Sequence, residues 1–136
     1  MFAIRGAVQV DEDSPQAIFS AVASLCDGLT RANHLVASRI VSAIFTLTPD
    51  LSSAFPARAA REQGWQDVPM ICAGEIPVPD APPRICRVLV LARGRREPRH
   101  VYLNGALGLL RPDLGDSTRT PRRKKGEGKK EKRRRP

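Results

Sequence analysis

The sequence predicts an α+β domain in which about five short strands form a mixed sheet and one main helix covers one face of it. Short apolar or alternating segments are numerous, whereas only one stretch has the apolar spacing of a long helix. No glycine-rich phosphate loop follows a strand. The second face of the sheet therefore needs cover from elsewhere, and a neighbouring subunit is the simplest source.

The first strand and the helix are expected at the start of the chain. Residues 2–10, FAIRGAVQV, alternate and are rich in strand-forming residues. Ser14 can cap a helix, Pro15 suits its first position, and acidic residues cluster at its positive end. The apolar stripe of this helix consists of Ile18, Ala21, Val22, Leu25 and Leu29.

The remaining elements follow from short apolar runs and turn residues. They are a strand at about 39–48 ended by Pro49, a helical turn within 52–65, strands near 68–73, at 85–92 and at 99–103, and a last turn within 105–114. No internal repeat is visible, so the chain reads as one domain.

The positive charge is concentrated at the C-terminus. Residues 121–136 contain ten Lys or Arg and two Glu, a charge of +8, and subtracting this from the total of +9 leaves +1 for residues 1–120. A nearly neutral folded domain is therefore expected at 1–117, followed by a basic, low-complexity tail at 118–136 that is disordered in isolation.

Cysteine usage and hydropathy predict the compartment. Cys26, Cys72 and Cys86 are odd in number and show no CxxC spacing, which disfavours both a disulfide framework and a zinc site. No run approaches the roughly 20 apolar residues needed to cross a bilayer, and the N-terminus turns polar too soon for a secretory signal. We expect a cytoplasmic protein without a bound metal or a membrane partner.

Two charged residues stand in apolar surroundings. Glu75 lies within VPMICAGEIPV, where a carboxylate costs several kcal/mol unless it is paired. Arg87 lies in the run 85–92, both faces of which are apolar, so it needs an anionic partner, either Glu75 or a ligand. Arg5 shares a strand face with small alanines and could equally be a simple surface arginine.

The relation of Cys72 to Glu75 is left open by their spacing. An offset of three puts them on opposite faces of a regular strand. Gly74 could supply a turn or bulge that brings both into one site. Cys72 could also be a small core residue, and no histidine follows it in a known thiol-protease pattern.

As a set, the candidates favour anion binding over proton transfer or covalent chemistry, because they are rich in cations and donors and poor in general bases. The candidates are Arg5, Arg58, Arg61, Cys72, Glu75, Arg87, Tyr102 and Arg111.

Six motifs in order resemble one family. They are IRGA (4–7), TPDL (48–51), FPARAAREQGWQDVPMICAGEIPV (55–78), RVLVL (87–91), RHVYL (99–103) and LRPDL (110–114). Over essentially residues 2–114, this pattern resembles the monofunctional chorismate mutases of the AroH class. The resemblance implies a pseudo-α/β-barrel homotrimer with active sites between subunits. It also implies the rearrangement of chorismate to prephenate without metal or cofactor.

The resemblance assigns a role to each matching position. Arg87 would donate to the breaking ether oxygen and to a carboxylate, Arg5 would bind a carboxylate, and Glu75 would accept from the ring hydroxyl. Cys72 would lie beside Glu75 as a polar contact rather than a nucleophile, and Tyr102 would reach the side-chain carboxylate. The positions expected to line the site are Phe55, Ala57, Arg58, Arg61 and Leu110, with Arg111 in the segment that closes its mouth. Arg58 departs from the lysine that the family often carries.

Two other functions fit parts of the sequence. A non-catalytic trimeric protein of the same fold could bind a small anion without transforming it. The ten cations of the tail could hold nucleic-acid phosphates nonspecifically, although no aromatic residue follows Tyr102 to stack on bases. The simplest reading of the tail is a solvated extension.

Overall fold

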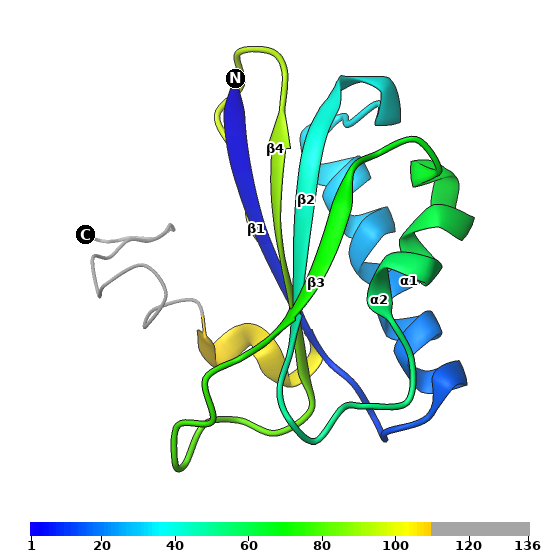
Figure 1. The fold of residues 1–136 in the computed structure, drawn as a ribbon. Helices are drawn as coiled ribbons and strands as arrows, with labels where there is room; N and C mark the ends of the chain where they lie inside the picture. The colour runs from blue at the N-terminus through cyan, green and yellow to red at the C-terminus, as the bar shows by residue number, and fades with distance from the viewer. Residues whose placement is uncertain (110–136) are drawn as a thin grey trace, which may run out of the picture. The chain divides into compact units, whose positions relative to one another are not determined.

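The computed structural model describes residues 1–109, of which 1–106 form one compact unit. The strands are β1 (Phe2–Gln9), β2 (Ile40–Leu47), β3 (Met70–Gly74), β4 (Ile85–Ala92) and β5 (Val101–Leu103); the helices are α1 (Pro15–Asn33) and α2 (Pro56–Ala60). The described residues also include a 3-10 turn at Ala37–Arg39, a π turn at Arg61–Trp65 and a 3-10 helix at Asn104–Leu109 (Figure 1). The predictions for Leu110, Arg111 and the tail lie outside the described residues.

The five strands form one mixed sheet in the order β3-β2-β4-β1-β5. The central strand β4 pairs antiparallel with both neighbours, and the two edge strands are added in parallel. The predicted strand at 85–92 is confirmed at both ends. The last strand is shorter than expected, because the backbone N–H of Arg5 donates to the side-chain Nδ1 of His100 at 3.0 Å, before β5 begins.

The start of α1 follows the predicted capping pattern. The side chain of Ser14 accepts a hydrogen bond from the backbone N–H of Ala17 at 3.1 Å, and Pro15 occupies the first turn. A Cβ on Gly6 would lie 3.0 Å from a methyl carbon of Leu25, so the glycine lets α1 approach β1 closely. The predicted stripe is buried at Ile18, Val22, Leu25 and Leu29.

The helical layer has a second member. The predicted helical turn within 52–65 is α2 followed by the π turn, with Gly64 at φ 101° where the helical path breaks. Figure 1 shows α1 and α2 on the same face of the sheet. Between helices and sheet lies the core, where the rings of Phe45 and Trp65 have centroids 6.4 Å apart.

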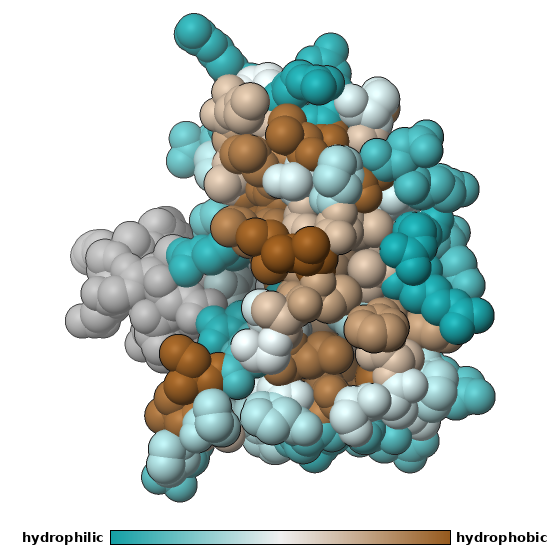
Figure 2. All heavy atoms as spheres, in the orientation of Figure 1, coloured by the Kyte–Doolittle hydropathy of each residue, from teal (hydrophilic) through white to brown (hydrophobic). Residues whose placement is uncertain are grey.

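The other face of the sheet is open in the described chain. Ile71, Ile44 and Leu89 stand opposite one another on β3, β2 and β4 and are 64%, 39% and 45% exposed. In Figure 2 hydrophobic residues gather over the strands, beside the polar surface of the helices. The prediction that helix covers one face of the sheet is thus confirmed, with two helices where one main helix was expected. Cover by a neighbouring subunit stays a prediction. None of the described helices combines the length and hydropathy that a membrane crossing requires.

Candidate active site

A bidentate ion pair joins Arg87 and Glu75, the two charged residues that the sequence places in apolar surroundings. Arg87 on β4 donates from Nε to Oε2 of Glu75 at 2.9 Å and from Nη2 to Oε1 at 3.1 Å. The hydroxyl of Thr46 on β2 donates to the same Oε2 at 2.5 Å. The carboxylate is 13% exposed and the guanidinium side chain 36%. Of the two partners expected for Arg87, the structure shows Glu75.

Two further candidates, Arg5 and Tyr102, lie on the same open face of the sheet as this ion pair. Even positions of β1 face α1, as the contact between Gly6 and Leu25 shows, so Arg5 faces the other way. Val101 packs near Gly28 of α1, which directs the next residue, Tyr102, to the open face as well. Arg5, Glu75, Arg87 and Tyr102 are called the open-face cluster below.

A neutral histidine joins β1 to β5 beside this cluster. Burial and the positive charge of Arg5 lower the pKa of His100 below its ordinary value. The neutral imidazole can therefore accept the backbone N–H of Arg5 at Nδ1. This bond fixes the backbone from which the Arg5 side chain extends.

Cys72 lies on the opposite face from Glu75. It stands opposite Phe45, whose side chain is buried in the core, and it packs partly against that core. Glu75 continues the alternation of β3, since its backbone N–H donates to the carbonyl of Leu47 at 2.9 Å. Gly74 has no positive φ and makes no bulge. Of the two alternatives left open by the spacing, the single chain shows the regular strand with Cys72 packed partly against the core, and not a bulge at Gly74.

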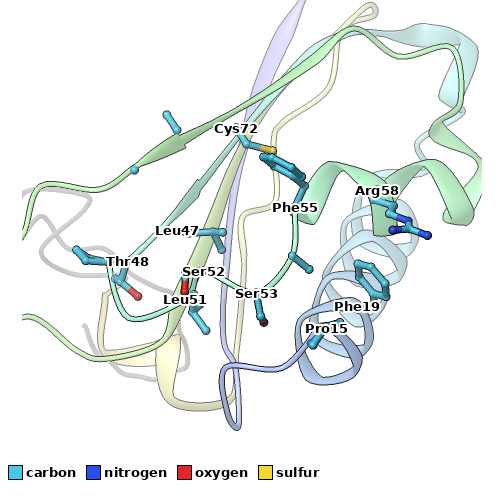
Figure 3. Close-up of a pocket in the computed structure, with 14 residues that line it drawn as sticks. Pro15, Phe19, Leu47, Thr48, Leu51, Ser52, Ser53, Phe55, Arg58 and Cys72 are labelled. Carbon is cyan, nitrogen blue, oxygen red and sulfur yellow. The ribbon is translucent and has the colours of Figure 1, made fainter.

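Cys72 instead lines a pocket of about 570 Å³ on the helical side (Figure 3). The pocket lies between the ends of β2 and β3, the loop that follows β2, and the first turns of α1. Its lining residues are Pro15, Phe19, Leu47, Thr48, Pro49, Leu51, Ser52, Ser53, Ala54, Phe55, Arg58, Cys72, Ala73 and Gly74. Three of the predicted site residues, Phe55, Arg58 and Cys72, thus meet here and are called the pocket cluster below.

Aromatic side chains border the pocket cluster. Phe55 is 71% exposed, which is unusual for a phenylalanine in a folded chain. The guanidinium carbon of Arg58 lies 5.7 Å from the ring centroid of Phe19 on α1, within the range of a cation–π contact. Figure 3 shows the side chains of Arg58 and Phe19 near one another at one end of the pocket.

Two predicted residues belong to neither cluster. Ala57 is buried against the core, and Arg61 is exposed in the π turn. Neither lines the pocket in the single chain. Leu110 and Arg111 fall outside the described residues, so their predicted contacts stay predictions, as do the substrate-binding roles of all the site residues.

The other two thiols, those of Cys26 and Cys86, are buried. Burial raises the pKa of Cys26 to about 12 and also raises that of Cys86. Within residues 1–109, no three His, Cys, Asp or Glu side chains stand close enough together to hold a metal ion.

Sequence reasoning missed Thr46, His100 and Phe19, all of which contact a predicted site residue. In β2 the odd positions 43, 45 and 47 are apolar, so alternation could have placed Thr46 on the face away from the core. His100 and Phe19 gave no such signal, because their contacts join residues 95 and 39 positions apart.

The fold and the two clusters define a class: an α+β protein whose described part groups arginine side chains on its surface. Comparison with known proteins narrows this class. The family described as chorismate mutase type I matches residues 1–114. The chain is 46% identical to the chorismate mutase AroH of Thermus thermophilus over 115 residues, which cover 82% of this chain and 93% of that protein. This chain belongs to the chorismate mutase type I family.

Two further relatives agree with this assignment. The chorismate mutase AroH of Bacillus subtilis is 36% identical over 115 residues, covering 82% of this chain and 90% of that protein. The solved structure of a chorismate mutase from Clostridium thermocellum superposes with a TM-score of 0.76 at 38% identity, covering 78% of this chain and 97% of that one. The fold predicted from the sequence is confirmed by this match.

Proposed function

We propose that the open-face cluster is the catalytic half of a chorismate mutase site, at which chorismate rearranges to prephenate. Membership of the family makes the chain an isomerase of this kind. The single observation that carries the catalytic assignment is the fixed Arg87 fork on the open face, held by Glu75 and Thr46.

The reaction itself asks little of a protein beyond shape and charge. One carbon–oxygen bond breaks and one carbon–carbon bond forms within a single molecule, and no proton or electron is gained or lost. Negative charge grows on the ether oxygen as that bond breaks. A cation already fixed at this oxygen stabilises the transition state without reorganising, which is the largest single term in many enzymes.

Arg87 meets this requirement. A guanidinium carries five N–H donors, so Arg87 can donate to Glu75 and to substrate at the same time. Glu75 holds the plane of the guanidinium, and Thr46 in turn holds the carboxylate. We assign to Arg87 the ether oxygen and one carboxylate of chorismate, and to Glu75 the ring hydroxyl. Arg5 and Tyr102 serve the carboxylates.

The two clusters belong to one site only if two copies of the chain meet. The pocket cluster lies on the helical side and the open-face cluster on the other, so one chain cannot close both around a substrate. We propose a homotrimer in which Phe55, Arg58 and Cys72 of one subunit face Arg5 and Arg87 of its neighbour. The exposed apolar row of Ile71, Ile44 and Leu89 supports this, because burying it stabilises an assembly.

Ala57, Arg61, Leu110 and Arg111 complete the proposed site as wall and mouth residues. We also place the enzyme in the cytoplasm, where the three cysteines, free in this structure, stay reduced.

Loss of chorismate absorbance and appearance of prephenate with the purified full chain test the activity directly. Turnover with no added metal or cofactor is expected. Binding of chorismate without turnover would instead favour the non-catalytic anion-binding protein.

A further inference from the structure

Asp13, the second residue before α1, fastens the loop that follows β2. One carboxylate oxygen, Oδ1, accepts from the backbone N–H of Ser52 at 3.0 Å, from that of Ser53 at 3.1 Å, and from the Ser53 hydroxyl at 2.8 Å. The other oxygen accepts from the Ser52 hydroxyl at 3.3 Å. Four hydrogen bonds thus join two segments that are about 40 residues apart in sequence.

This carboxylate has no other evident task. The cap of α1 is the side chain of Ser14, which accepts the N–H of Ala17, so Asp13 is not needed there. The hydrogen bond from the Ser53 hydroxyl, followed by that from the Ser52 backbone, lowers the pKa of Asp13 below its ordinary value. The group is therefore charged at neutral pH, the state in which it can accept from all four donors.

The fastened loop leads directly into the pocket cluster. Phe55 immediately precedes α2, and its carbonyl accepts from the backbone N–H of Arg58 at 3.2 Å. Wherever residues 52–55 are held, Phe55 and Arg58 are therefore carried with them. In Figure 3 Ser52, Ser53 and Phe55 lie along the loop, with Pro15 and Phe19 on the facing turns of α1.

We propose that Asp13 is a positioning residue that holds the loop 52–55 so that Phe55 and Arg58 present a fixed wall to chorismate. The inference rests on the proposed function, since it takes Phe55 and Arg58 as substrate contacts. It adds that part of the order of this wall comes from a carboxylate that itself touches no substrate.

The direction in which KM changes when Asp13 is removed distinguishes a positioning role from a purely electrostatic effect of its charge. Removing a negative charge near a site for a dianion strengthens binding of that dianion through the field alone. Releasing the loop has the opposite effect, because a mobile wall must be ordered each time substrate binds. Asp11 offers a matched control, since it is an exposed acid on the same segment whose side chain makes no hydrogen bond or ion pair with the described residues.

The test compares Asp13→Ala with Asp11→Ala in the full chain, by steady-state kinetics with chorismate and by hydrogen exchange over residues 50–58. Asp13→Ala is expected to raise KM about tenfold with a smaller fall in kcat, because the wall binds ground and transition states alike. The amides of Ser52 and Ser53 should exchange faster, with the melting temperature nearly unchanged. Asp11→Ala should leave exchange unchanged and KM unchanged or lower.

Asp13→Asn keeps an oxygen that can accept the two backbone bonds, so it should fall between wild type and Asp13→Ala. A Ser52→Ala, Ser53→Ala double variant, which loses only the hydroxyl donors, gives a second reading if Asp13→Ala does not fold. Its exchange should rise modestly and its KM only slightly.

Unchanged exchange at Ser52 and Ser53 in Asp13→Ala would overturn the proposal, because the loop would then be held by something else. Faster exchange with a KM equal to that of Asp11→Ala would overturn it too, since the loop would not position the wall. An inactive wild-type chain would refute the proposed function, and the positioning role with it, while exchange would still report on the hydrogen bonds.

Discussion

The open-face cluster stands on strands, whereas the pocket cluster stands largely on a loop and one turn of helix. Arg87 lies on the central strand β4, with paired strands on both sides, and its fork is fixed by groups from the end of β3 and from β2. Phe55 and Arg58 are exposed. Arg58 contacts Phe19 on α1, and the loop before Phe55 is bonded to Asp13, just before that helix. A sheet holds a charge in place more rigidly than a connection does. Changes to the first region should therefore act mainly on kcat, and changes to the second mainly on KM.

Arg87 should show the largest effect. Arg87→Ala removes the preorganised donor at the ether oxygen and should lower kcat by two to three decades, about 3–4 kcal/mol of transition-state stabilisation. Arg87→Lys should also be poor, because a point charge replaces a fork that serves two acceptors. Single-turnover measurements with chorismate, beside size-exclusion chromatography to check assembly, test this. Near-normal turnover in Arg87→Ala would disprove the assignment.

Substitution of Glu75 should give the next largest fall in kcat, and substitution of Thr46 a smaller one. Glu75→Ala leaves Arg87 without the carboxylate that orients it and should lower kcat about 30-fold, the value of a charged hydrogen bond of about 2 kcal/mol. Thr46→Val removes one donor to that carboxylate and should cost about fivefold. If Thr46→Val cost as much as Glu75→Ala, the ordering of contacts around Arg87 would have to be revised.

Arg58 should show a smaller effect, confined to binding. Arg58→Gln should raise KM several-fold with little change in kcat, and the difference from wild type should shrink as salt screens the exposed charge. Arg31→Gln is the matched control, since Arg31 is an exposed arginine paired with Asp27 on α1. A large fall in kcat for Arg58→Gln would blur the proposed division between the two regions.

The join of β1 to β5 should respond to pH. The pKa of His100 is lowered by burial first and by Arg5 second, so the fold favours the neutral ring. Its contribution is complete above the unfolded pKa of about 6.5 and is lost as the pH falls through the lower folded value. The melting temperature should fall less between pH 7 and pH 5 in His100→Asn, whose amide oxygen accepts without titrating. Parallel curves for the two proteins would contradict this.

Much of the fold could be predicted because local signals agree with it. The ends of β4 follow from a run that is apolar except for Arg87, and the start of α1 follows from Ser14 and Pro15. Burying a charge is costly, so Arg87 was expected to have an anionic partner. Glu75, which pairs with it in the structure, was one of the two partners considered. The spacing of Cys72 and Glu75 left a bulge at Gly74 open, and the structure shows the regular strand instead.

The parts that could not be predicted depend on contacts distant in sequence. Asp13 meets Ser52 and Ser53, and His100 meets Arg5, through side chains whose neighbours carry no signal of the contact. The two clusters lie on opposite sides of the sheet in a single chain, so one chain does not display a complete site. The substrate roles proposed for the site residues therefore rest on the family as well as on this geometry.

The central claim is that Arg87 donates to the oxygen that gains charge as the bond breaks. A crystal structure of the assembly with a bicyclic mimic of the transition state tests it most directly. The account predicts that the bridging oxygen of the mimic lies within about 3 Å of a guanidinium nitrogen of Arg87, the usual hydrogen-bond distance. A bridging oxygen held by another residue, with Arg87 out of reach, would contradict it.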